Sequence, residues 1–167
     1  MRPQRTRAGR CAKDAHRHLI LSLGSRTMKQ TVKLNYQTRK MESAGRTIGQ
    51  FKPLSPTEGQ LELNGSSYTY KFYGPFSYGY NIGLYQLGKE IAVRNYDAHE
   101  GEFILRVTDH ITFNLNDESL YCSKGPAGRI TFTEHEVVMQ FNHLVPEKEF
   151  GVVAALVFLD TMWGNLV

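Results

Sequence analysis

The chain has 167 residues, of which 41% are hydrophobic, and its formal net charge is +4. Residues 1–27 carry seven Arg and Lys residues against a single Asp, a charge of +6, so the remaining residues carry −2. Because the positive charge belongs to this leader, we expect no nucleic-acid partner for the rest of the chain. The two cysteines predict no disulfide framework and favour a reducing, cytoplasmic location.

The charge distribution also suggests the domain organisation. We expect residues 1–27 to be a disordered basic leader and residues 28–167 to form a single domain. The leader is rich in Arg and poor in acids, as organelle transit peptides are. A transit-like leader and a non-native extension that precedes a true start at Met28 are therefore the alternatives to a native disordered leader.

From Met28 onward, apolar and polar residues alternate with the period of a half-buried β-strand. A first strand is followed by a weaker one over residues 46–52, which Gly49 interrupts and Pro53 is expected to stop. Asn64-Gly65 then lies between two apolar-alternating segments. This dipeptide is the strongest short signal for a hairpin, because both central residues of such a turn need positive φ.

The later segments repeat the same pattern with short polar connections. Ile91 and Val93 form the predicted core phase of one strand, with Glu90 and Arg94 in its polar phase. Further alternating segments cover residues 68–73, 80–84, 103–107, 111–115, 120–122, 130–132 and 137–141. About eleven short strands without intervening helices indicate an antiparallel meander in a barrel or sandwich.

Residues 150–163 are apolar on every face of a helical wheel, so a helix here must be enclosed by protein or by lipid. The segment is shorter than the roughly 20 residues that a membrane span needs, and it contains Asp160. We therefore predict an all-β protein with one buried helix. Its architecture is an antiparallel closed barrel of about 11–12 strands around a central C-terminal α-helix.

The segment GVVAALVFLD at residues 151–160 resembles the C-terminal core helix of the tubby-like superfamily, which includes tubby C-terminal domains, LURP-one-related proteins and phospholipid scramblases. GRTIG at residues 45–49 is similar to the G-x-x-I-G strands of these proteins. The resemblance implies a roughly twelve-stranded barrel around a hydrophobic helix. It also implies a non-enzymatic binding or regulatory module that engages anionic phospholipid or a protein partner, peripherally at a membrane surface.

Two other function classes stay open from the residues alone. One is a small-ligand-binding barrel or barrel enzyme, which needs polar groups that converge on a cavity. The other is a tail-anchored membrane protein whose helix over residues 150–163 lies in lipid. The oligomeric state is not predicted.

Asp160 is the most informative single residue, since an unpaired carboxylate in a buried helix costs several kcal/mol. We expect it to lie at the barrel mouth, or to meet a partner such as Arg94, Arg106 or an amide at a strand end. Its expected role is structural, and the mouth position predicts that Asp160→Leu stays folded.

Five residues are candidates for contact with a ligand or membrane. Phe76 and Tyr78 are aromatics in a turn that does not need them, and they could insert at a membrane interface. Lys71, Arg94 and Arg106 occupy the predicted polar phase of their strands, where solvated surface charge is the default interpretation.

No set of residues indicates catalysis. The histidines outside the leader share no metal-ligand spacing, and Cys122 has no evident base to activate it. We therefore expect no catalytic residues, no metal and no cofactor.

Overall fold

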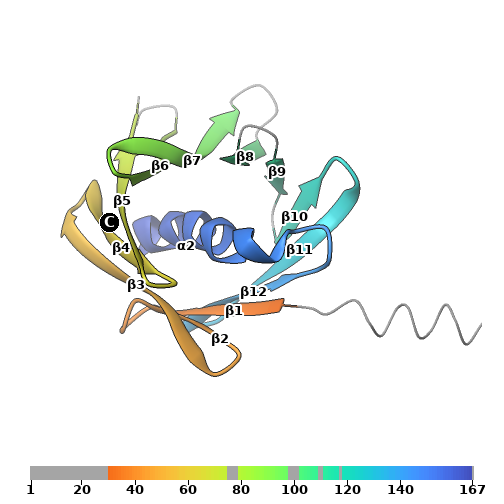
Figure 1. Cartoon of the computed structure of the whole chain (residues 1–167), viewed down its shortest axis with the longest axis horizontal. Coiled ribbons are helices and arrows are strands. Elements are labelled where there is room, and N and C mark those ends of the chain that lie inside the picture. The colour runs from red at the N-terminus through yellow and green to blue at the C-terminus, as the bar shows by residue number, and fades with distance from the viewer. Residues whose placement is uncertain (1–29, 75–78, 98–101, 109–110, 117, 167) are drawn as a thin grey trace, which may run out of the picture.

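The computed structural model describes residues 30–74, 79–97, 102–108, 111–116 and 118–166. Within them, twelve antiparallel strands close into a barrel in which each strand pairs with its sequence neighbours and β1 pairs with β12 (Figure 1). The strands are β1 (Gln30–Asn35), β2 (Lys40–Ser43), β3 (Arg46–Ser55), β4 (Glu58–Leu63), β5 (Ser66–Tyr73), β6 (Asn81–Gln86), β7 (Lys89–Asp97), β8 (Glu102–Thr108), β9 (Ile111–Asn116), β10 (Ser119–Cys122), β11 (Gly125–Phe132) and β12 (Glu136–Phe141).

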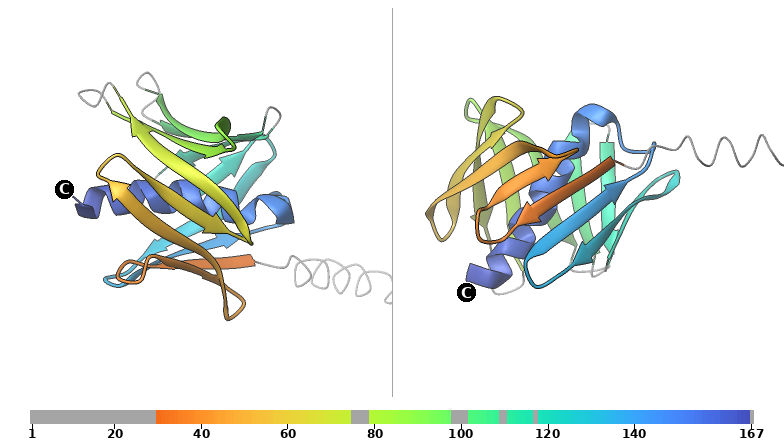
Figure 2. Two further views of the ribbon diagram at one scale, coloured as in Figure 1. Left: turned by 60° about the vertical axis from the view of Figure 1, so that its left-hand side comes forward. Right: turned by 90° about the horizontal axis from the view of Figure 1, so that it is seen from below.

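After β12, a short 3-10 helix, η1 (Glu147–Glu149), leads into α2 (Phe150–Leu166). Figure 2 shows α2 running through the barrel, with the C-terminal end of the helix at one mouth. The seven side chains of residues 153–159 are each at most 2% exposed. The predicted closed barrel around a C-terminal helix is therefore confirmed.

The uniform apolarity of α2 explains its place, because every face of the helix meets inward side chains of the strands. At its start, the Phe150 ring stacks on Phe141 of β12 with centroids 5.2 Å apart. A Cβ at Gly151 would lie 3.0 Å from Cδ1 of Leu63, so the first turn of the helix packs closely on β4. Burying a large apolar side chain contributes about 1.5–3 kcal/mol, and this helix buries several.

The β4–β5 hairpin has the type of turn that its sequence predicts. Asn64 and Gly65 have φ of 49° and 80°, as the Asn-Gly signal predicts. The turn between β6 and β7 has nearly the same backbone, with φ of 51° at Leu87 and 78° at Gly88. There, a leucine occupies the position that Asn takes in the first hairpin.

Two details of the β2–β3–β4 region differ from the prediction. β3 continues through Gly49 and past Pro53, where the alternation predicted an interruption and an end. The register of β3 on β4 shifts between Pro53 and Ser55, and such an irregularity accommodates a residue without a backbone N–H. The four-residue β2, which was not predicted, closes the sheet between β1 and β3.

No helix in the described part of the chain is both long enough and apolar enough to span a bilayer.

Candidate functional site

Two of the basic candidates are brought into one row on the outer face of the barrel. Lys71 of β5 pairs with Gly83 of β6, Gly83 pairs with Val93 of β7, and Val93 pairs with Arg106 of β8. Side chains at paired positions point to the same side of a sheet, so Lys71 and Arg106 both point outward. Both are exposed, whereas the glycine and valine between them are buried.

Tyr85 lies over the glycine in this row. A Cβ at Gly83 would come within 2.7 Å of the Tyr85 ring, so a larger residue there would push the ring aside. The Nζ atom of Lys71 is 5.8 Å from the centroid of the same ring, a cation–π distance. The hydroxyl of Tyr85 donates a hydrogen bond of 3.1 Å to Oε2 of Glu90 on β7.

Several side chains of this surface interact with the carboxylate of Glu90. Arg106 Nη2 is 3.8 Å from its Oε1, and Tyr73 is near enough for Glu90 to act on its pKa. Burial, followed by the bond to Glu90, raises the pKa of Tyr85 to about 12. Burial and Glu90 also raise the pKa of Tyr73, while Arg106 opposes the shift. We call Lys71, Tyr73, Tyr85, Glu90 and Arg106 the outer-face cluster; its formal charge is +1.

Arg94 does not belong to this surface, and its predicted outward position is wrong. Its side chain is 1% exposed, and it lies opposite the buried Ile82 and Leu105 in the neighbouring strands. The pairing of β6 with β7 shifts register, so that Leu84 pairs with Ala92 and Tyr85 with Glu90. This bulge inverts the alternation: Glu90 faces outward, whereas Arg94, four residues later, faces inward.

Asp160 of α2 is the partner of the buried arginine, as one of the predicted alternatives proposed. Its Oδ1 accepts hydrogen bonds from Arg94 Nη2 at 2.7 Å and from the Tyr80 hydroxyl at 2.5 Å. Arg94 also donates to the Tyr80 carbonyl at 3.1 Å, and its guanidinium carbon lies 4.9 Å from the centroid of the Tyr80 ring. The Asp160 side chain remains 25% exposed, which agrees with a place near the barrel mouth.

The electrostatics of this buried cluster indicate a structural role, in which the Arg94–Asp160 ion pair joins β7 to α2. Burial lowers the pKa of Arg94, and the carboxylate of Asp160 opposes that shift. Burial, then the bond to Asp160, raises the pKa of Tyr80, so the phenol stays neutral. A carboxylate that already holds a guanidinium and a phenol serves to fix the helix in place.

The two aromatic candidates from the sequence cannot be placed in either cluster. Phe76 and Tyr78 lie outside the described residues. Among the residues that the structure does describe, no three His, Cys, Asp or Glu side chains are grouped so that they could hold a metal ion.

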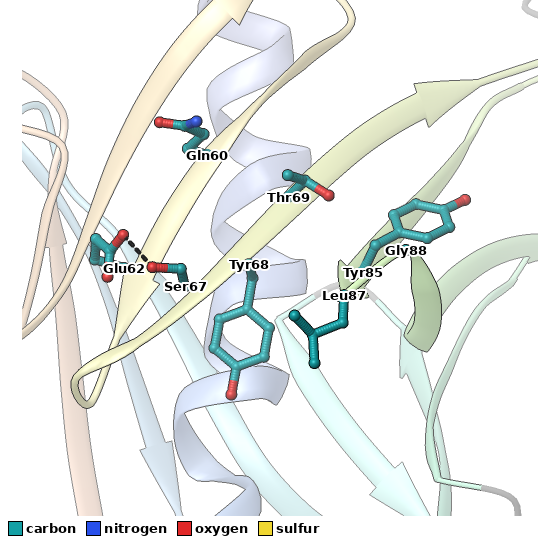
Figure 3. A pocket seen from close by; sticks show the side chains of 8 residues that line it. All are labelled: Gln60, Glu62, Ser67, Tyr68, Thr69, Tyr85, Leu87 and Gly88. Carbon is teal, nitrogen blue, oxygen red and sulfur yellow. Dashed lines mark hydrogen bonds between the residues drawn. The ribbon is translucent and has the colours of Figure 1, made fainter.

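A pocket of about 260 Å³, which the sequence did not predict, adjoins the outer-face cluster and shares Tyr85 with it. Figure 3 shows the residues that line it. It opens between the β4–β5 hairpin and the β6–β7 turn. Polar side chains of β4 and β5 line it together with Tyr85 and the turn residues Leu87 and Gly88. The only sequence feature that points to it is the set of polar residues that alternate along the two strands of the Asn64-Gly65 hairpin. Such residues are usual on an exposed face of a sheet.

Comparison with known proteins found no matching family model, curated protein or solved structure.

Proposed function

We propose that this protein is a non-enzymatic binding module that engages anionic phospholipid at a membrane surface through the outer-face cluster. The observation that carries the proposal is the row across β5 to β8, in which Lys71 and Arg106 flank Gly83 and Val93. The two cations are exposed at either end of this row, so each can contact a phosphate group without rearranging the sheet.

The filled interior supports a function on the outside of the barrel. The lumen is occupied by α2, whose residues 153–159 are buried against the strands. A barrel that carries a ligand in its lumen needs that space. The enclosed position of α2 also counts against the tail-anchor alternative, since a helix packed inside the sheet cannot lie in lipid.

The chemistry of the cluster suits a phosphate. Lysine binds phosphate as a point charge, and arginine binds it through its planar set of N–H donors. The hydroxyls of Tyr73 and Tyr85 add two neutral donors, of which that of Tyr85 bonds Glu90. Glu90 therefore lowers the positive potential of the surface and limits its affinity for an anion.

We further propose kinship with the tubby-like and LURP-one-related proteins. The closed twelve-stranded barrel around a hydrophobic C-terminal helix supports this proposal, together with the segment at residues 151–160.

Co-sedimentation with liposomes tests the lipid proposal. The full chain should sediment with phosphatidylserine-containing vesicles and much less with pure phosphatidylcholine. Each Lys or Arg at a membrane surface contributes about 1 kcal/mol, so Lys71→Ala with Arg106→Ala should weaken partitioning roughly thirtyfold. Glu90→Gln should strengthen it, because a negative charge is removed from the cluster.

The control is Lys52→Ala with Arg129→Ala, which removes the same charge from exposed positions on β3 and β11, outside the cluster. Equal losses in the two double variants would show that only net charge matters. No preference for anionic vesicles would reject lipid as the ligand and leave a protein partner to be sought by cross-linking at position 71.

A further inference from the structure

The pocket beside the outer-face cluster has a regular polar floor. Gln60 pairs with Thr69 and Glu62 pairs with Ser67 across β4 and β5, and all four side chains are exposed on the outer face of the barrel. An amide, a carboxylate and two hydroxyls thus form a two-by-two array (Figure 3). Tyr85 continues the first row, because it pairs with Thr69 from β6.

Leu87 on the rim is unfavourable for folding in two ways. Its side chain is fully exposed, with a relative exposure of 103%, and its φ of 51° is in the left-handed region that disfavours a leucine. In the neighbouring hairpin, Asn64 and Gly65 adopt the same positive-φ backbone. A strained, exposed apolar residue where a polar one would fold better points to a contact outside the chain.

The charge of the lining distinguishes this pocket from the outer-face cluster. Its lining residues include the carboxylate of Glu62 and no lysine or arginine, so it does not suit an anion. Ser67 Oγ donates to Glu62 Oε1 at 2.6 Å, which orients the carboxylate before a ligand arrives. A carboxylate and an amide can bond adjacent hydroxyls, and aromatic and leucine side chains can cover a C–H face.

We propose that this pocket binds a saccharide, with one pyranose ring on the polar array, its apolar face against Leu87 and its edge beside Tyr85. The volume of about 260 Å³ is below the roughly 300–1,000 Å³ of sites for drug-sized ligands, which fits a single sugar ring. The inference does not depend on lipid binding, because the ligand is neutral and, apart from Tyr85, the side chains are different.

The test is a two-dimensional ¹H–¹⁵N NMR titration of the full chain with methyl glycosides of common hexoses and N-acetylhexosamines at millimolar concentration. Binding should shift the side-chain amide of Gln60 and the backbone amides of Thr69 and Gly88. Tetramethylammonium is titrated in parallel as a cationic probe. Glu62→Gln should weaken the binding of the best glycoside about tenfold, because a charged acceptor becomes neutral. The matched control, Glu58→Gln, lies on the same strand outside the pocket and should leave it unchanged.

Leu87→Asn separates a ligand contact from a structural role. It should raise the denaturation midpoint, since Asn suits this turn, and yet weaken glycoside binding several-fold. The proposal is overturned if no glycoside shifts these resonances or if only tetramethylammonium does. It is also overturned if Leu87→Asn gains stability without losing affinity, or if Glu58→Gln weakens binding as much as Glu62→Gln.

Discussion

The ion pair between Arg94 and Asp160 predicts that removing one partner lowers the stability of the fold more than removing the other. The guanidinium is 1% exposed, whereas the carboxylate is 25% exposed. Asp160→Leu leaves a buried cation without its counter-charge, which costs about 3–5 kcal/mol. Since small domains are stable by only about 5–15 kcal/mol, this variant should be severely destabilised. The mouth position of Asp160 alone predicted a folded variant, and the buried arginine changes that expectation.

The opposite substitution should cost less. In Arg94→Met, the carboxylate can still be reached by water and still accepts a bond from Tyr80, so we expect a loss of about 1–2 kcal/mol. The double variant should be closer to wild type than the sum of the two losses, because neither charge remains unpaired. Asp160→Asn keeps an acceptor of the same size and should be milder than Asp160→Leu.

Urea denaturation of the full chain measures these differences, followed by far-UV circular dichroism and by fluorescence of its single tryptophan. Equal losses for Asp160→Leu and Arg94→Met would refute the asymmetry of burial. Simple additivity in the double variant would refute the pairing itself.

Two further predictions concern Tyr70, whose hydroxyl lies over Gly59. Gly59→Ala should destabilise the barrel by at least about 1–3 kcal/mol in urea denaturation, because the new Cβ would be 2.3 Å from the Tyr70 hydroxyl and 2.7 Å from the Lys52 carbonyl oxygen. Tyr70→Phe should not rescue it, since the carbonyl clash remains; full rescue would contradict this. Burial raises the pKa of Tyr70 to about 12, so its neutral form contributes stability that is complete below pH 10 and lost as the pH rises towards 12. The urea midpoint should therefore fall less between pH 9 and pH 11 in Tyr70→Phe than in wild type. An equal fall in the two proteins would contradict the raised pKa of Tyr70.

Much of the architecture could be predicted from the sequence because its signals are local and repeated. Period-two alternation identified most of the strands, and Asn64-Gly65 identified its hairpin. A helix without a polar face had to be enclosed, and fourteen or so apolar residues could not span a bilayer. These features depend on side-chain periodicity and hydration, which a single chain segment already contains.

The candidate sites were decided by the tertiary structure. The bulge between β6 and β7 turned Arg94 inward and Glu90 outward, and it arises from pairing with a neighbouring strand that alternation within β7 does not reveal. The row from Lys71 to Arg106 joins residues of four strands, and the pocket depends on how two hairpins lie beside each other. Strand register and hairpin placement depend on pairing between strands, so the charges acquire neighbours only once the barrel has closed.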